Sequence, residues 1–327
     1  MTRKPARINP DRPEATAFAP ATVANVAVGF DVLGFALEGV GDRVRVSVDE
    51  DATEAVSVES ITGVVTDLPT DPGGNTAAVA VAKMIEALDL DVGLRIALDK
   101  GIPLGSGMGG SAASAVGAVV AANGLLVEPL SAEALLPFAL EGEAAASGAP
   151  HADNAAPCLY GGMTAVVATD PLRIVGVPTP AGLACVVVRP ELRIDTKEAR
   201  AALRDDVPLE LSVEQSMRLT GFLIGCHRGD VDLIGQSMKD LIAGPQRAVA
   251  ITGFDAARDA ALGAGALGFA IAGSGPSVFA WVRSIDDGSS VESAIRAAFQ
   301  SLGLNSQAWV SRLGCAGAHL VGEQAER

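Results

Sequence analysis

The chain is poor in cysteine and in positive charge. Its 327 residues carry 24 Lys and Arg against 39 Asp and Glu, a formal net charge of -15. This balance disfavours nucleic acid and anionic membrane surfaces as partners. The spacing of the cysteines matches neither a disulfide framework nor a metal-binding pair, so we expect reduced thiols. The four cysteines are Cys158, Cys185, Cys226 and Cys315.

The first residues contain no apolar stretch. Residues 1–15 are polar and include proline and arginine. The sequence therefore predicts neither a secretory signal nor a membrane-spanning segment there. We expect residues 1–16 to form a disordered tail and the protein to be cytoplasmic. No internal repeat or low-complexity tract is visible in the rest of the chain.

The length predicts two domains, because 327 residues are many for one compact core. Apolar residues make up 49% of the chain, enough for a sizeable buried interior. A turn-rich stretch at 170–182 is the expected boundary, which gives domains at 17–175 and 176–327. Any anionic ligand would need amide dipoles, a divalent cation and well-placed arginines to offset the acidic composition.

Hydrophobic periodicity predicts an α+β protein. Residues 43–48 alternate strictly, as in a half-buried strand, and Asn75 is a plausible N-cap for a helix over 75–88. The other expected strands are 93–98, 161–168, 184–188, 268–272, 277–282 and 307–313. The other expected helices are 111–122, 131–147, 196–203, 212–228, 231–241, 254–263 and 290–302.

The most informative segment is a glycine-rich loop that runs into a helix. Residues 101–114 read GIPLGSGMGGSAAS and follow a predicted strand. Glycines let a backbone approach a ligand closely, and a helix N-terminus directs unpaired N–H groups at one point. Ser106 and Ser111 add hydroxyl groups there. The pattern predicts a site for a nucleotide phosphate.

Spacing alone leaves several kinds of loop open. Gly105, Gly107 and Gly110 satisfy the dinucleotide spacing G-x-G-x-x-G, but no second strand with an acidic end follows the helix. A Walker A loop needs a lysine where Ser111 stands. The H-R-D and D-F-G segments of protein kinases are absent from the sequence. A turn that merely opens a tightly packed helix is the structural alternative.

The segment from Pro103 to Ala113 resembles the phosphate loop of the GHMP small-molecule kinases, whose usual core is Gly-Leu-Gly-Ser-Ser-Ala. Gly110 replaces the first serine of that pair here. Residues 19–34 (APATVANVAVGFDVLG) and 147–162 (SGAPHADNAAPCLYGG) resemble the corresponding motifs of the homoserine kinases in that family. Residues 271–279 (IAGSGPSVF) resemble the third GHMP motif. The four motifs occur in the family's order.

This resemblance implies an α+β, two-domain GHMP kinase architecture. The N-terminal domain would resemble the ribosomal-protein S5 domain 2 fold, and the C-terminal domain would be ferredoxin-like. It also implies transfer of the γ-phosphoryl of ATP to the hydroxyl of L-homoserine, a step of threonine biosynthesis. The expected ATP-binding residues are Pro103, Leu104, Gly105, Ser106, Gly107, Met108, Gly109, Gly110, Ser111, Ala112 and Ala113.

The resemblance also assigns the metal and catalytic residues. Ser111 and Glu143, which stands five residues before Gly148, would bind Mg²⁺. Asn154 would orient the substrate hydroxyl, with no dedicated general base, and would be catalytic together with Ser111 and Glu143. The alternatives are a helix N-cap for Ser111 and a solvated helix charge for Glu143.

The remaining expected residues bind the homoserine zwitterion. Asp31 would pair with its ammonium group, and Arg200 and Arg247 with its carboxylate, which a guanidinium meets in a bidentate manner. A structural Asx turn is the alternative for Asp31. His151 has a substrate-binding and a structural interpretation. The full expected substrate set is Asn25, Asp31, His151, Asn154, Thr196, Arg200, Arg247 and Gly273.

Two other functions remain open at this point. One is a different GHMP kinase acting on mevalonate or a sugar, although these substrates carry no ammonium group for Asp31. The other is a catalytically silent binding protein on the same scaffold. A homodimer is possible by analogy with relatives.

Overall fold

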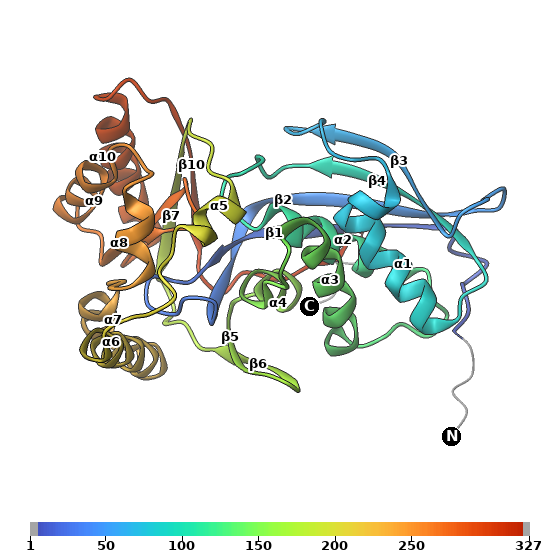
Figure 1. Ribbon diagram of the computed structural model, residues 1–327, viewed down its shortest axis with the longest axis horizontal. Helices are drawn as coiled ribbons and strands as arrows, with labels where there is room; N and C mark the ends of the chain where they lie inside the picture. Colours follow the sequence, from blue (N-terminus) through green and yellow to red (C-terminus); the bar gives the residue numbers. More distant parts are fainter. Residues whose placement is uncertain (1–5, 323–327) are drawn as a thin grey trace.

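The computed structural model describes residues 6–322, apart from the side chains of residues 146, 147, 196 and 197. The chain forms two β-sheets with helices packed against them (Figure 1). The first sheet has seven strands in the order β11-β1-β2-β4-β3, with β5 paired to β2 and β6 paired to β5. Its strands are β1 (Glu14–Ala24), β2 (Leu33–Asp49), β3 (Val56–Gly63), β4 (Gly93–Lys100), β5 (Met163–Thr169), β6 (Leu172–Val177) and β11 (His319–Leu320).

The long strand β2 organises the first sheet. Its first residues pair with β5, and its alternating segment at 43–49 pairs antiparallel with β4. The period-two pattern correctly predicted that segment, in which Val44 and Val46 are fully buried. Strands β3 and β4 are parallel neighbours joined by helix α1 (Thr76–Leu88). Asn75 caps α1, since its Oδ1 accepts hydrogen bonds from the N–H groups of Ala77 and Ala78.

Four helices lie together on one face of this sheet (Figure 1). Besides α1 they are α2 (Gly110–Gly124), α3 (Ala132–Ser147) and α4 (Ala152–Tyr160). Helix α2 is buried on nearly all sides and consists mainly of alanine, valine and glycine. Small residues allow this close packing: a Cβ at Gly117 would lie 2.7 Å from Cγ2 of Val44. The phosphate-loop helix is therefore fixed in the centre of the core.

The second sheet has the order β10-β7-β9-β8. Its strands are β7 (Ala184–Pro190), β8 (Gly268–Ile271), β9 (Val278–Val282) and β10 (Ser306–Arg312). Along β9, Phe279 and Trp281 pack into the apolar core that also contains the buried residues of the first sheet. Val278, Ala280 and Val282 pack into a second core. Phe35 of β2 meets Phe279 and Trp281 edge-on, with ring centroids 5.8 Å apart in each pair. The two sheets thus share one apolar interface.

Helices also accompany the second sheet. Helices α9 (Phe254–Gly263) and α10 (Gly288–Gln300) pack with it around Val291, Ile295 and Phe299. The remaining helices are α5 (Thr196–Ala201), α6 (Leu209–Arg228), α7 (Val231–Ser237) and α8 (Ala243–Ala248), with 3-10 turns at Pro72–Gly74 and Ile285–Asp287. No helix among residues 6–322 is long and apolar enough to cross a membrane.

The structure differs from the sequence predictions in several places. Residues 6–16 do not form a disordered tail: Ile8 bridges Leu126 and β1 begins at Glu14, while residues 1–5 lie outside the described part. The expected domain boundary at 175/176 falls inside β6, which belongs to the first sheet. The chain enters the second sheet with the next strand, β7. Strand β11 returns the end of the chain to the first sheet. The sequence patterns also missed β1, β3, β6, β11, α4 and α8, of which β11 has two residues and β6 and α8 have six each.

Candidate active site

A cleft of about 380 Å³ lies between the two sheets' ends, where the loop after β4, the start of α2 and the turn after β8 meet. Its wall gathers residues that are far apart in the sequence. Of the expected site residues it includes Asn25, Asp31, residues 103–111, Glu143, His151, Asn154, Arg200, Arg247 and Gly273.

Two of the expected site residues, Ala112 and Ala113, are not among the described residues that line the cleft. Both are fully buried in the first turn of α2, so their assignment to ATP binding stays a prediction. Thr196 begins α5, and its side chain lies outside the described residues.

Three glycines give the phosphate loop its shape. Gly105, Gly107 and Gly109 have φ values of 60°, 77° and 66°, a region that other residues rarely adopt. A Cβ at Gly107 would lie 2.4 Å from the carbonyl oxygen of Ala272, and one at Gly109 would lie 2.1 Å from Oγ1 of Thr22. The loop therefore needs glycine for its backbone conformation and for the close approach of its neighbours.

Hydrogen bonds join this loop to both halves of the chain. The N–H of Thr22 in β1 donates to the carbonyl of Met108 at 3.1 Å, and the N–H of Ser277 donates to the carbonyl of Ser106 at 3.2 Å. The Ser106 side chain is buried and accepts a bond from the N–H of Met108. Helix α2 begins directly after Gly109, so its N-terminal dipole points toward the cleft end of the loop.

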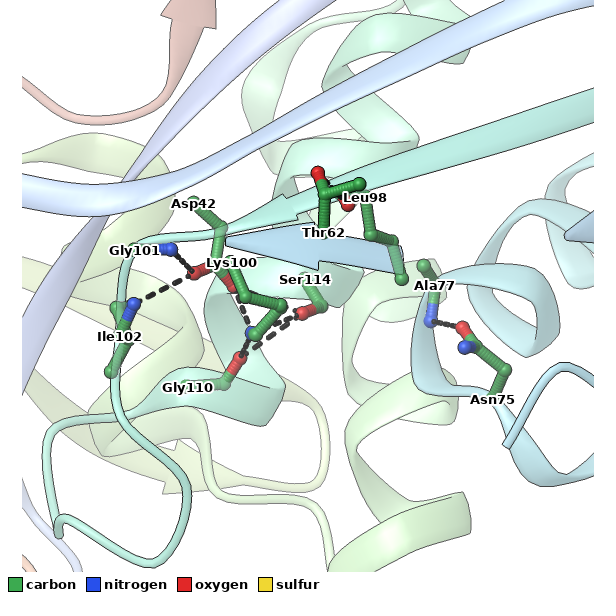
Figure 2. A network of polar contacts seen from close by, with 10 residues as sticks. All are labelled: Asp42, Thr62, Asn75, Ala77, Leu98, Lys100, Gly101, Ile102, Gly110 and Ser114. Carbon is green, nitrogen blue, oxygen red and sulfur yellow. Dashed lines mark hydrogen bonds and ion pairs between the residues drawn. The ribbon is translucent and has the colours of Figure 1, made fainter. Parts of the chain in front are cut away.

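A buried ion pair lies under the loop (Figure 2). The Nζ of Lys100, at the end of β4, forms an ion pair with Oδ2 of Asp42 in β2. It also donates to Oγ of Ser114 at 2.7 Å and to the carbonyl of Gly110 at 2.9 Å. The other Asp42 oxygen accepts from the N–H groups of Gly101 and Ile102. One carboxylate thus fixes the start of the loop and, through Lys100, the first turn of α2.

The acidic residue Glu143 reaches the cleft from α3. Its side chain is 4% exposed, and its Oε1 lies 3.3 Å from Nδ1 of His151, the N-cap residue of α4. This contact raises the pKa of His151 above its ordinary value, with burial acting in the opposite direction. Ser111, in the first turn of α2, lines the same cleft.

The next residues on α4 place a carboxyl and an amide together. Asp153 is buried, and burial, reinforced by the nearby charge of Asp31, raises its pKa from 3.8 to about 7. The Oδ1 of Asn154 accepts a hydrogen bond from Oγ1 of Thr22 at 2.8 Å. This bond holds the Asn154 amide beside the phosphate loop.

The segment between β1 and β2 supplies the expected ammonium-binding carboxylate. Asn25 and Asp31 both have positive φ, at 70° and 57°. The Asn25 Oδ1 accepts from the N–H of Asp31, and its Nδ2 donates to the carbonyl of Gly273. Oδ2 of Asp31 accepts a short hydrogen bond from Nη1 of Arg200. The Asn25 side chain thus binds the Asp31 backbone across six residues, while the Asp31 carboxylate pairs with Arg200.

Arg247 approaches the same point from α8. It is 8% exposed, and its Nη1 donates to the carbonyl of Gly273 at 2.9 Å. Burial lowers its pKa, with Asp31 acting against this effect. The guanidinium carbons of Arg200 and Arg247 lie 5.1 and 5.0 Å from the ring centroid of Phe30.

Sequence reasoning missed the supporting residues of the site. Thr22 lies inside a quoted motif, and Lys100 directly precedes the loop, so both could have been suspected. Asp42 stands 58 residues before Lys100 and gave no signal. Phe30 would read as an ordinary apolar residue.

Two family models match the chain. The model of the GHMP kinases N terminal domain covers residues 75–162, and that of the GHMP kinases C terminal covers residues 222–303. The fold and the cleft therefore define a GHMP kinase. A homoserine kinase of Xanthomonas campestris pv. campestris (strain B100) is 46% identical over 308 residues, 94% of each chain. One of Xylella fastidiosa (strain 9a5c) is 45% identical over the same length. The chain belongs to the homoserine kinase family.

Solved structures agree with this assignment. The crystal structure of homoserine kinase from Cytophaga hutchinsonii ATCC 33406 superposes with a TM-score of 0.92 at 42% identity, covering 96% of this chain and 99% of that one. The L. major mevalonate kinase in complex with R-mevalonate has a TM-score of 0.73 at 15% identity, covering 95% and 100%, and shows the shared fold alone. The expected two-domain α+β GHMP kinase architecture is confirmed.

Proposed function

We propose that this protein transfers the γ-phosphoryl group of ATP to the side-chain hydroxyl of L-homoserine, giving O-phospho-L-homoserine and ADP. The observation that carries the proposal is one cleft with two kinds of binding group. A glycine loop at a helix N-terminus forms one part of its wall, and a carboxylate with two guanidiniums, Asp31, Arg200 and Arg247, forms another. Its full-length relatives are homoserine kinases.

The glycine loop is suited to the phosphates of ATP. The backbone N–H groups of residues 105–111 and the N-terminal dipole of α2 provide fixed partial positive charge. Phosphoryl transfer depends mainly on positioning and on neutralising charge, so such donors suffice for much of the task. This help is needed in a chain with a net charge of -15.

The cleft fits Mg²⁺ bound together with ATP. Within residues 6–322, no group of three or more His, Cys, Asp or Glu side chains is arranged to hold a metal ion. Mg²⁺ does not need such a group, since it typically binds one or two carboxylates and completes its shell with phosphates and water. Glu143 and Ser111 would hold it. When bound, the ion neutralises charge that develops on the transferred phosphoryl group.

The opposite charges suit the two ends of an amino acid. Asp31 would bind the ammonium group, and Arg200 and Arg247 would bind the carboxylate. The Gly273 carbonyl, which already accepts from Asn25 and Arg247, fixes the spacing of these groups. Mevalonate and sugars carry no ammonium group, so they would leave Asp31 without a role in the substrate site.

Asn154 would orient the substrate hydroxyl. Its Oδ1 is held by Thr22, which leaves the amide N–H group to direct the nucleophile. Little proton removal is needed early in a loose, metaphosphate-like transition state, so an amide in this position is chemically sufficient. In this scheme His151 orients Glu143 through their 3.3 Å contact.

The test is ADP formation by the purified protein with Mg-ATP and a panel of L-homoserine, mevalonate and galactose. We expect turnover that depends on L-homoserine. Glu143→Gln should lower kcat, because the proposed metal loses a charged ligand. Arg247→Leu should mainly raise the KM for homoserine. Preference for another acceptor, or the absence of turnover, would refute the proposed function.

A further inference from the structure

Phe30 contacts both guanidiniums of the proposed carboxylate site. It lies between β1 and β2, directly before Asp31, and is half-buried. Cζ of Arg200 is 5.1 Å from the ring centroid, and Cζ of Arg247 is 5.0 Å from it. The described wall of the cleft includes both arginines but not the ring. Phe30 therefore acts on the arginines and has no direct contact with the cleft.

Two guanidiniums on one ring repel each other. Arg200 is one of the charges that lower the pKa of Arg247, after burial. The negative face of an aromatic ring attracts a cation and favours Arg over Lys. The Phe30 ring thus offsets part of the cost of gathering two positive charges at one place.

The two arginines depend on the ring to different degrees. Arg247 is buried and also bonded to the Gly273 carbonyl. The Arg200 side chain is 53% exposed and forms an ion pair with Asp31. A substrate ammonium that binds Asp31 competes with Arg200 for that carboxylate. When Asp31 binds the substrate ammonium and its ion pair with Arg200 is lost, the contact with the Phe30 ring would keep Arg200 beside Arg247.

We propose that Phe30 is a positioning residue that holds Arg200 and Arg247 in place for the substrate carboxylate. The inference rests on the proposed function and adds a determinant of its specificity for α-amino acids. It predicts that the ring affects substrate binding far more than the phosphoryl-transfer step.

The experiment measures steady-state kinetics of Phe30→Met, with Phe30→Leu as a second apolar replacement of similar size. We expect the KM for L-homoserine to rise about fivefold or more, as the loss of one or two partly desolvated cation–π contacts implies. The kcat and the KM for ATP should change by less than about twofold. Phe30→Tyr keeps an aromatic face and should retain most of the wild-type affinity.

A matched control removes an aromatic ring under an arginine elsewhere. Phe18 of β1 is half-buried, and Cζ of Arg43 lies 5.6 Å from its ring centroid. Phe18→Met should leave the KM for homoserine unchanged. L-homoserine amide keeps the hydroxyl and ammonium groups without the carboxylate, so the effect of Phe30→Met on its binding should fall to within about twofold.

The outcomes separate the two proposals. Wild-type protein without homoserine-dependent turnover contradicts the proposed function itself. An active wild type with an unchanged KM in Phe30→Met, or an equal loss for the amide, overturns the role of Phe30. If neither apolar variant folds, Phe30→Tyr decides the question: a Tyr variant that binds homoserine as weakly as Arg247→Leu refutes the role of the ring.

Discussion

The buried ion pair between Asp42 and Lys100 offers the sharpest test of how the phosphate loop is held (Figure 2). Asp42→Asn keeps the shape of the side chain and one carbonyl oxygen. That oxygen can still accept from the N–H groups of Gly101 and Ile102. The substitution removes the negative charge and turns an amide N–H₂ group toward the Lys100 ammonium.

The expected loss is large because both charges are buried. The Asp42 side chain is fully buried, and that of Lys100 is 5% exposed. Breaking one partner of a buried pair typically costs about 3–5 kcal/mol, since the remaining charge is left uncompensated. Lys100 keeps its bonds to Gly110 and Ser114, which places the expected loss toward the lower end of that range.

The assay is urea unfolding of the wild type, Asp42→Asn, Lys100→Met and the double variant. The double variant should lose less than the sum of the single variants, because it leaves no buried charge. Asp255→Asn, which removes an exposed pair with Arg258 on α9, is the control and should leave the midpoint unchanged. A loss below about 1 kcal/mol in Asp42→Asn, or strict additivity, would refute the reasoning.

The other predictions concern the loop glycines and one buried acid. Gly107→Ala should lower the melting temperature and weaken ATP binding far more than Gly39→Ala: their φ values are 77° and 78°, but only at Gly107 does the added Cβ meet a carbonyl oxygen, that of Ala272 at 2.4 Å. Equal effects in calorimetry and ATP titration would contradict this. Burial raises the pKa of Asp153 from 3.8 to about 7, so from about pH 4 upward the carboxyl ionises in the unfolded chain but not in the folded one, and stability is lost until about pH 7. The difference in melting temperature, Asp153→Asn minus wild type, should therefore increase between pH 5 and pH 8. A difference that does not change with pH would show that this carboxyl is ionised in the folded protein.

Three nearby charged groups influence the pKa of Asp153. Asp31 and Glu143 raise the pKa of Asp153, and His151 lowers it. The raised pKa of His151 also favours the low-pH side, since a protonated His151 beside Glu143 contributes stability that is lost as pH rises. The two groups act in the same direction, and Asp153→Asn removes the Asp153 titration together with the contribution that Asp153 makes to the raised pKa of His151.

Much of the fold was predictable because its signals are local. The alternation at 43–48 predicted part of β2, and Asn75 before an apolar helix predicted the start of α1. The glycines and small residues before α2 predicted a loop for a nucleotide phosphate, and the resemblance to the GHMP kinases indicated which kind. The sequence did not predict strands such as β3 and β6, because their burial is partial and irregular. It did not predict α4, because Pro157 lies inside that helix.

The sequence by itself determined the chemical groups: a glycine loop with Ser111, a carboxylate at Glu143 and an acid with two arginines. Residue type and short spacing predicted the glycine loop, whereas the roles of Ser111, Glu143, the acid and the two arginines came from the resemblance to the GHMP kinases. Only the tertiary structure decided that Asp42 neutralises Lys100 under the loop and that Phe30 contacts both Arg200 and Arg247. Such contacts join residues from separate strands and helices, and their energy arises from burial that no local pattern reveals.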